Sequence, residues 1–169
     1  MRLSNINKSW TLFLDRDGVI NKKIENDYVK NIGEFEFLPN ALHAIVECSK
    51  VFGKIIVVTN QQGIGKGLMT ESNLNSIHQH LLDKVQQAGG RIDAIYHAPK
   101  LAQENSEMRK PNIGMALKAK KQFPEIEFQK SIMVGDSMSD IEFGKKAKMH
   151  TFLIGENQIY TSLFQLFQS

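Results

Sequence analysis

The sequence is poor in cysteine, proline and tryptophan, with one, four and one of these among its 169 residues. The single cysteine, Cys48, excludes an internal disulfide and fits a reducing compartment. It lies in an apolar pattern with helical spacing, which indicates a buried, inert thiol rather than a nucleophile. No apolar run approaches the roughly 20 residues that span a bilayer, and residues 1–10 lack the apolar core of a signal peptide. We therefore expect a cytoplasmic protein that does not enter a membrane.

A strong excess of charge of one sign is also absent. The formal net charge is +3, and 23% of the residues are charged while 41% are hydrophobic. This composition is typical of a folded globular protein, and the length suits a single domain over residues 1–169. The small positive excess suits an anionic substrate. It is too weak to indicate a nucleic-acid-binding surface, so we do not expect nucleic acid as a partner.

Short apolar runs alternate with stretches of helical spacing along the chain. The runs are rich in β-branched residues and bounded by polar or turn residues, which predicts buried strands. Pro39 is expected in the first turn of the first helix, and Thr70 is expected to cap the second. The predicted strands cover residues 10–14, 54–59, 92–97, 131–135 and 150–154, and the predicted helices residues 39–51, 70–89, 113–122 and 139–147.

This alternation predicts the fold class and the place of the binding site. Strands joined through helices form right-handed βαβ units, so we expect a three-layer α/β fold with a Rossmann-like parallel sheet and helices on both faces. Ligands of such sheets bind beyond the carboxyl ends of the strands. The residues that follow Leu14, Val58, His97 and Val134 are therefore the candidates for function.

Two carboxylates, Asp15 and Asp17, follow the first predicted strand. Residues two apart in an extended chain point the same way, so both side chains can face one cavity. Adjacent carboxylates repel each other unless a cation or a proton lies between them, and magnesium prefers such oxygen ligands. Gly18 permits the turn that opens the strand end toward a ligand. Taken alone, an Asp-x-Asp pattern is more often a solvated loop.

Thr59 and Asn60 end the second predicted strand. A threonine hydroxyl and nearby backbone N–H groups can bind phosphate oxygens, although a threonine at a strand end more often caps a turn. The glycine-rich run at residues 63–67 matches neither a dinucleotide-binding pattern nor a P-loop. We interpret it as a turn that presents Lys66 as a candidate substrate contact.

Two basic residues, Arg109 and Lys110, stand directly before the third predicted helix. The helix dipole disfavours cations at that end, so the helix alone gives no reason for them. A fixed cation here could neutralise charge on a transferring phosphoryl group. Phosphate binding and a solvated basic pair are equally good explanations at this point.

Asp136 and Asp140 follow the fourth predicted strand. Asp136 is placed to complete a metal site with Asp15 and Asp17. Asp140 fits the first turn of the next helix, where the dipole favours an acid, and this explanation competes equally with a metal role. Each of these patterns is modest alone. Four strand ends nevertheless bring them to one edge of one sheet, a coincidence that packing does not explain.

The chain resembles the haloacid dehalogenase superfamily of phosphohydrolases over nearly its whole length. Residues 13–21 (Phe-Leu-Asp-Arg-Asp-Gly-Val-Ile-Asn) match its first motif, and residues 59–61 (Thr-Asn-Gln) match the second. Lys110 matches the third motif, and Gly135 and Asp136, with Asp140, match the fourth. The order and spacing of these four motifs are highly specific to the superfamily.

This resemblance implies a role for each motif residue in a phosphatase. Asp15 would be the nucleophile that forms an aspartyl-phosphate intermediate, and Asp17 the general acid and base. Thr59 and Lys110 would bind the phosphate. Magnesium would be held by Asp15, Asp136 and the backbone carbonyl of Asp17.

A finer similarity is to the branch of histidinol-phosphate and heptose-bisphosphate phosphatases. Residues 15–21 (Asp-Arg-Asp-Gly-Val-Ile-Asn), 28–29 (Tyr-Val) and 109–111 (Arg-Lys-Pro) fit that branch. Its members lack a large cap domain, which agrees with the short inserts here. The resemblance implies that the loops at residues 18–38 and 98–110 select the substrate.

One departure concerns a zinc-binding loop that members of this branch usually carry before the Arg-Lys-Pro sequence. Aligned on neighbouring residues, its four ligand positions are Ala98, Lys100, Ser106 and Met108, none of which is a strong zinc ligand. His97 lies one position away and is interpreted as a lone histidine at a strand end. We therefore predict no zinc, and the substrate assignment weakens because this loop shapes the site.

The sequence thus predicts a magnesium-dependent phosphatase of a small sugar phosphate, acting as a monomer or small homo-oligomer. The favoured substrate is the 7-phosphate of D-glycero-D-manno-heptose 1,7-bisphosphate, and histidinol phosphate comes second. A polynucleotide 3′-phosphatase is a third reading because residues 59–67 resemble that group too. A non-catalytic phosphosugar-binding protein is the contrasting class, and its expected mark, a lost nucleophile or metal carboxylate, is absent.

Overall fold

A five-stranded, all-parallel sheet forms the centre of the fold, in the order β3-β2-β1-β4-β5. The computed structural model describes residues 6–155. All five predicted strands are present within one or two residues of their predicted bounds. The strands are β1 (Thr11–Leu14), β2 (Lys54–Asn60), β3 (Ala94–Ala98), β4 (Ser131–Gly135) and β5 (His150–Leu153).

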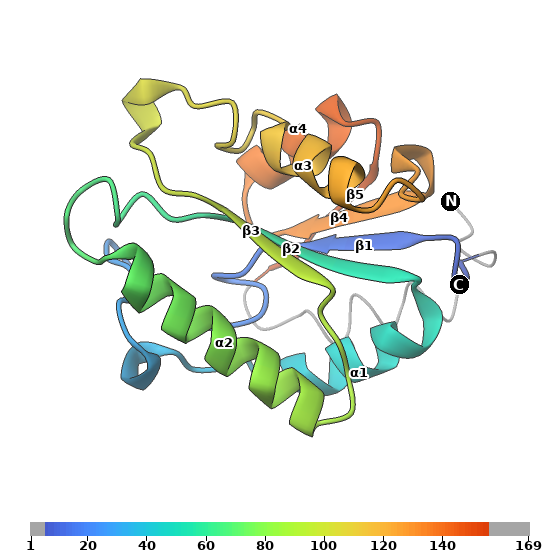
Figure 1. The fold of residues 1–169 in the computed structure, drawn as a ribbon, viewed down its shortest axis with the longest axis horizontal. Coiled ribbons are helices and arrows are strands. Elements are labelled where there is room, and N and C mark those ends of the chain that lie inside the picture. The colour runs from blue at the N-terminus through green and yellow to red at the C-terminus, as the bar shows by residue number, and fades with distance from the viewer. Residues whose placement is uncertain (1–5, 156–169) are drawn as a thin grey trace.

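Helices cover both faces of this sheet, so the predicted three-layer α/β architecture is confirmed. In Figure 1, α1 and α2 lie on one side of the strands and α3 and α4 on the other. Among residues 6–155, no helix combines the length and the apolar character needed to cross a bilayer. The helices are α1 (Ala41–Val51), α2 (Glu71–Gln87), α3 (Gly114–Gln122) and α4 (Met138–Lys146), with 3₁₀ turns η1 (Ile32–Glu34), η2 (Ala102–Glu104) and η3 (Phe128–Lys130).

Strand β1 shows why its sequence is apolar throughout. Side chains alternate between the two faces of a strand, and both faces of this sheet are covered. Leu12 and Leu14 pack into the core beneath α1 and α2, whereas Phe13 packs into the core beneath α3 and α4. All three are fully buried. A continuous apolar run is therefore the expected pattern for the central strand of such a sheet.

Local signals at two helix starts have different outcomes. Thr70 caps α2 as predicted, and it forms a reciprocal capping box with Asn73. Pro39 was expected inside the first turn of α1, but it lies before the cap residue. Asn40 occupies the cap position with a left-handed φ of 64°, so the helix begins only at Ala41.

Cys48 lies in α1 and is buried, as predicted. Burial raises the pKa of its thiol to about 12. A thiol with such a pKa holds its proton at neutral pH and is a poor nucleophile. The residue is therefore part of the core.

The topology places β1 between β2 and β4, so the ends of all three open onto the same edge. The connections at residues 15–40 and 99–113 are the longest irregular stretches in residues 6–155. They contain only one 3₁₀ turn each and isolated bridges. Within the described residues there is accordingly no large cap domain over the strand ends.

Candidate active site

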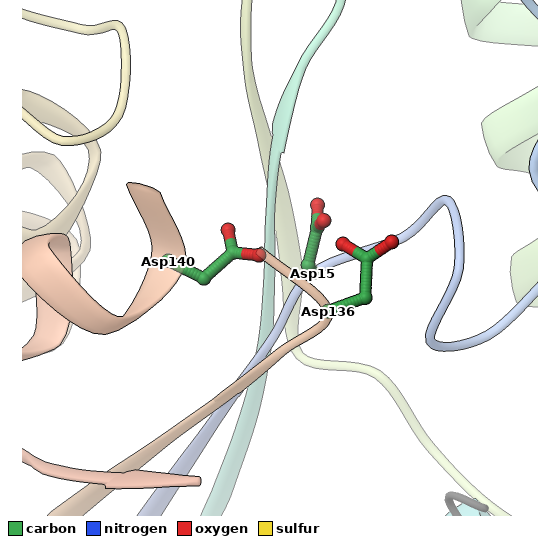
Figure 2. A group of neighbouring side chains, drawn as sticks. All are labelled: Asp15, Asp136 and Asp140. Carbon is green, nitrogen blue, oxygen red and sulfur yellow. The ribbon is translucent and has the colours of Figure 1, made fainter. Parts of the chain in front are cut away.

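Three carboxylates converge where β1 and β4 end. Asp15 follows β1, Asp136 follows β4, and Asp140 belongs to the first turn of α4. One carboxylate oxygen of each lies within 4.8 Å of those of the other two. Figure 2 shows the carboxyl groups of Asp15 and Asp136 beside each other, with Asp140 reaching in from α4. Such an all-oxygen set suits a hard divalent cation.

Two glycines allow the backbone to come this close to the carboxylates. Gly18 has a φ of 84°, and a Cβ there would lie 2.2 Å from Oδ2 of Asp136. At Gly135, a Cβ would lie 2.1 Å from the Cβ of Asp140. Any side chain at either position would push a cluster carboxylate aside. The glycines in the first and fourth motifs are thus required by the geometry of the cluster.

Lys110 is a buried cation in the middle of this cluster. Its Nζ donates to the backbone carbonyl of Val58 at 2.8 Å, and it lies 2.6 Å from Oδ1 of Asp140 and 2.8 Å from Oδ1 of Asp15. Burial lowers the pKa of Lys110, but the two carboxylates outweigh that effect and raise it above its ordinary value. The side chain therefore stays charged beside the nucleophile candidate.

At Asp15, in contrast to Lys110, the effect of burial on the pKa outweighs that of the opposite charge nearby. Burial raises the pKa of its carboxyl group to about 7, against the opposing effect of Lys110. Repulsion from Asp140 and Asp17 adds to the increase. A further positive charge next to Asp15 would favour the carboxylate form.

Asp140 and Asp136 differ in how far their oxygens are already used. Oδ2 of Asp140 accepts from the backbone N–H and the hydroxyl of Ser137, and its Oδ1 pairs with Lys110. It thereby closes the capping box of α4, as its predicted helix-start position requires. Oδ1 of Asp136, by contrast, is buried without a hydrogen-bond partner among the described residues. Oδ2 of Asp136 lies 3.3 Å from Nζ of Lys23, so Oδ1 is the oxygen that Asp136 can offer a cation, whereas both oxygens of Asp140 are already used.

The carboxylate of Asp17 is not part of this cluster and is bound by a set of donors. Nη2 of Arg16 lies 2.9 Å and 3.1 Å from its two oxygens. Asn21 donates to Oδ1 at 2.9 Å and Gln61 to Oδ2 at 2.8 Å. Burial would raise the pKa of Asp17, but Arg16 and these hydrogen bonds hold it below its usual value.

Residues at the end of β2 form the next wall of the site. Gln61 donates to the hydroxyl of Thr59 at 2.9 Å and so joins it to Asp17. Asn60 accepts from the backbone N–H of Lys110 and donates to its carbonyl, at 3.0 Å and 3.1 Å. Asn60 therefore fixes the backbone of Lys110, a structural contact that its predicted phosphate-binding role does not include.

These groups surround a cavity of about 260 Å³. Its remaining wall comes from residues 23–29, in the loop after β1, so that loop lies where a substrate-selecting element is expected. Neither Lys66 nor Arg109 is among the lining residues. Nζ of Lys66 lies 5.3 Å from the centre of the Tyr28 ring, and Nη1 of Arg109 is buried without a partner in the described chain. The lining residues are Asp15, Asp17, Lys23, Ile24, Asp27, Tyr28, Val29, Thr59, Asn60, Lys110, Asp136, Ser137, Ser139 and Asp140.

The part of the loop before Lys110, residues 98–109, is held mainly by hydrogen bonds of backbone and amide groups, and the carboxylate of Glu104 accepts from the backbone N–H of Leu101 at 2.7 Å. Gly65 donates its backbone N–H to the carbonyl of Pro99 at 3.0 Å. Nδ2 of Asn112 donates to Oδ1 of Asn105 at 3.1 Å and to the carbonyl of Ser106 at 3.0 Å. Of this loop, only Lys110 lines the cavity. Its predicted share in substrate selection is thus indirect in this structure.

His97 does have partners, so its interpretation as a lone histidine is wrong. Its Nε2 lies 2.8 Å from a carboxylate oxygen of Glu71, at the start of α2. Its ring also packs edge-on against the ring of His78, with centroids 6.1 Å apart. Helix α2 passes beneath the end of β3 and brings both partners to it. The sequence alone could not show this packing.

Four contacting residues were missed as site residues. Arg16, Asn21 and Gln61 stand inside the recognised motifs, so their place in those motifs was a usable signal. His78 lies in α2, far from any motif. The only sequence signal for His78 is that it is a polar residue on the buried face of α2. The other residues of that face are Leu74, Ile77, Leu81 and Val85.

Comparison with protein families matches residues 11–153 to the model described as polynucleotide kinase 3 phosphatase. A D-glycero-α-D-manno-heptose-1,7-bisphosphate 7-phosphatase of Mycobacterium bovis is 43% identical over 133 residues, which cover 79% of this chain and 70% of that protein. One of the same name from Campylobacter jejuni is 37% identical over 167 residues, covering 96% and 92%. The relatives are phosphatases, which disfavours a non-catalytic binding protein.

Among solved structures, a similar one is a D,D-heptose 1,7-bisphosphate phosphatase from B. bronchiseptica complexed with magnesium and phosphate. The TM-score is 0.80 at 29% sequence identity, and the match covers 92% of this chain and 86% of that one. The similarity therefore extends over most of the chain.

Proposed function

We propose a substrate for this chain, which belongs to the haloacid dehalogenase superfamily of phosphatases. Within the superfamily it belongs to the family described as polynucleotide kinase 3 phosphatase, and to the heptose-bisphosphate branch. The substrate is D-glycero-D-manno-heptose 1,7-bisphosphate, from which the enzyme removes the 7-phosphate. Both curated relatives described above carry this activity in their names, for the α anomer. We expect the same anomer to be preferred here.

One observation carries the proposed chemistry: Asp15 lies in contact with Lys110 at the mouth of a small cavity that Asp17, Thr59 and Asp136 also line. A carboxylate in this position can attack phosphorus. Lys110 and the hydroxyl of Thr59 would bind the oxygens of the phosphoryl group, because a fixed charge and a hydroxyl donor offset its developing negative charge. The cavity accepts a phosphoryl group with part of a sugar.

Asp15 would act as the nucleophile and Asp17 as the general acid and base. A carboxylate oxygen of Asp15 bonds to phosphorus as the bond from phosphorus to the sugar oxygen breaks. Asp17, which must first take up a proton because its pKa is low in the free enzyme, gives that proton to the sugar oxygen. Asp17 then takes a proton from the water that attacks the aspartyl phosphate. Phosphate leaves, and Asp15 and Asp17 return to their starting states.

The residues at the cluster fit a magnesium ion. Asp136 offers a buried oxygen without another partner, Asp15 lies next to it, and all donors in the group are oxygens. Asp15, Asp136 and the backbone carbonyl of Asp17 would hold the ion. When bound, it would reduce repulsion between the nucleophile and the substrate phosphate.

Phosphate release from a panel of substrates tests the assignment. The panel contains both anomers of the heptose bisphosphate, histidinol phosphate, other sugar phosphates, nucleotides and an aryl phosphate. We expect the highest kcat/KM on the α anomer, with the 1-phosphate retained in the product. A higher kcat/KM on histidinol phosphate would make that compound the substrate, and the proposed phosphatase chemistry would still hold. No release from any ester would contradict both.

Removal of metal tests the second part of the proposal. Excess chelator should abolish phosphate release, and added magnesium should restore it while calcium, a larger cation, should not. Full activity in chelator would contradict the metal assignment. Restoration by magnesium alone would agree with the prediction that no zinc is needed, and a further requirement for zinc would contradict it.

A second candidate function, a polynucleotide 3′-phosphatase, is favoured by the description of the family model and by the resemblance of residues 59–67 to that group. Binding of a nucleic-acid strand through its phosphates would weaken steeply with salt. We expect no such dependence, given the net charge of +3. Release of phosphate from a 3′-phosphorylated oligonucleotide at a kcat/KM above that of the sugar phosphate would support this candidate instead. A cytoplasmic location stays a prediction.

A further inference from the structure

Arg16 is a fully buried cation next to the proposed general acid and base. Its guanidinium group donates through Nη2 to both oxygens of Asp17. Its Nη1 lies 3.1 Å from Nε2 of His78, and its Nε has no hydrogen-bond partner among the described residues. A buried guanidinium group with only two partners depends on each of them for its position.

Among residues 6–155, His78 is the one hydrogen-bond partner found for Arg16 Nη1, and it comes from outside the β1 loop. An arginine can only donate hydrogen bonds, so Nε2 of His78 must be the acceptor and the ring must be neutral. Burial and the nearby charge of Arg16 lower the pKa of His78 to about 3, which agrees with a neutral ring. The lone pair on Nε2 is therefore available to Arg16 at all pH values where the enzyme would work.

The position of His78 is in turn held by its contact with His97, which pairs with Glu71. Glu71 and His78 are seven residues apart in α2, which places them on one face, two turns from each other. Between them lies His97, whose Nε2 pairs with Glu71 and whose ring packs against His78. A chain of contacts thus runs from the surface at the start of α2 through His78 and Arg16 to Asp17.

We propose that His78 is a positioning residue for catalysis: its neutral imidazole fixes the guanidinium group of Arg16, which in turn fixes the carboxylate of Asp17. The inference rests on the role of Asp17 as general acid and base proposed above. His78 touches no reacting atom. Its loss would let Arg16 move, and Asp17 would then meet the leaving oxygen less often in the right orientation.

Two aryl phosphates of similar shape distinguish this role from a general loss of packing. Phenolate is a poor leaving group that needs a proton from Asp17, whereas p-nitrophenolate leaves easily without one. The value of kcat/KM reports the steps up to departure of the leaving group. His78→Leu removes the acceptor and keeps the volume, and we expect it to lower kcat/KM on phenyl phosphate about tenfold more than on p-nitrophenyl phosphate.

His78→Gln is the rescue variant, because its amide oxygen can reach the place of Nε2. We expect it to keep both kcat/KM values within about threefold of the wild type. His80→Leu is the matched control on the same helix. His80 is half-buried against Phe35 and stands outside the contacts to Arg16, so the ratio of the two substrates should stay at the wild-type value.

Equal losses on the two substrates would overturn the inference, as would a Gln variant as defective as the Leu variant, or a Leu variant without loss. Circular dichroism and thermal melting establish that each variant folds. If His78→Leu does not fold, His78→Asn takes its place, since its shorter amide cannot reach Arg16. Because the readout uses aryl phosphates, failure of the heptose substrate would leave this comparison unaffected.

Discussion

The strand ends, together with Lys110, and the loop at residues 98–109 lie side by side, yet they are held by different interactions. At the strand ends, Lys110 contacts two carboxylates within 2.8 Å, and Arg16 binds Asp17 at 2.9 Å, all largely removed from water. The loop depends mainly on hydrogen bonds of backbone and amide groups, with one from the backbone N–H of Leu101 to the carboxylate of Glu104, and the ion pairs found in residues 6–155 include none within residues 99–109. Charge is concentrated where bonds would be made and broken.

The difference shows what each region requires. Removing one partner of a buried ion pair strongly destabilises the fold, because the other charge stays buried without a partner. The charged side chains at the strand ends are therefore held in essentially one arrangement. Neutral hydrogen bonds near the surface each contribute only about 1 kcal/mol, so a loop built from them can change in sequence without loss of the fold. The chemistry should therefore be sensitive to single substitutions, and the loop tolerant of them.

The largest effect is expected from Asp15→Asn, which removes the nucleophile and keeps its shape. Turnover should fall by at least about 10³-fold while the circular dichroism spectrum is retained. Mass spectrometry of acid-quenched protein should detect a phosphoryl adduct on the wild type only. Turnover within tenfold of the wild type would show that another residue attacks phosphorus.

Lys110→Met should come next, because it leaves Asp15 and Asp140 buried without their cation. We expect kcat/KM to fall about 100-fold and the free energy of unfolding by about 3–5 kcal/mol, measured by urea denaturation. Part of the stability should return on acidification, since protonation removes the repulsion between the carboxyls. Exposed Lys84→Met is the control and should change neither quantity. A stability loss as small as that of the control would mean that the buried ion pairs contribute little.

A smaller effect concerns the dependence of stability on pH through His78. Its pKa in the folded protein is about 3, below the ordinary value of 6.5, because it is buried beside Arg16 and His97, while Asp17 acts in the opposite direction. As the pH falls from 6.5 toward 3, the unfolded chain therefore gains a proton that the folded protein does not, and stability is lost.

Between pH 7 and pH 5 this loss should amount to about 1–2 kcal/mol, and His78→Gln should remove it. Urea denaturation of both proteins at the two pH values measures the difference. An identical pH dependence in the variant would show that His78 is protonated in the folded state. It would also contradict the neutral ring on which its contact with Arg16 depends.

The smallest effect is expected from Asn112→Ala in the loop. The variant loses the two hydrogen bonds to Asn105 and Ser106, so the free energy of unfolding should fall by about 1 kcal/mol. The kcat/KM on p-nitrophenyl phosphate should change less than about twofold, because the loop reaches the cavity only through Lys110. Asn75→Ala, on the exposed face of α2, is the control. A tenfold loss of kcat/KM would show that the loop is as tightly coupled to the site as the strand ends are.

Most of the fold was predictable, because buried parallel strands leave a clear apolar signature and the helices between them have caps and periodic faces. The error at Pro39 arose from Asn40, whose left-handed backbone delays the start of α1. The sequence around Pro39 does not show at which residue the helix begins. Likewise, the capping role of Asp140 could be read from the sequence, but its pairing with Lys110 could not.

The sequence by itself determined which residues end the strands, and so which carboxylates, hydroxyl and cation meet at one edge of the sheet. Only the tertiary structure decided how their charges are paired. Lys110 stands 30 residues from Asp140, and His78 stands 62 from Arg16, and both pairs form because helix packing brings them together out of water. Burial is a property of the whole fold. The residue types are therefore given by the sequence, whereas their pKa values and orientations depend on burial between the sheet, its helices and its loops.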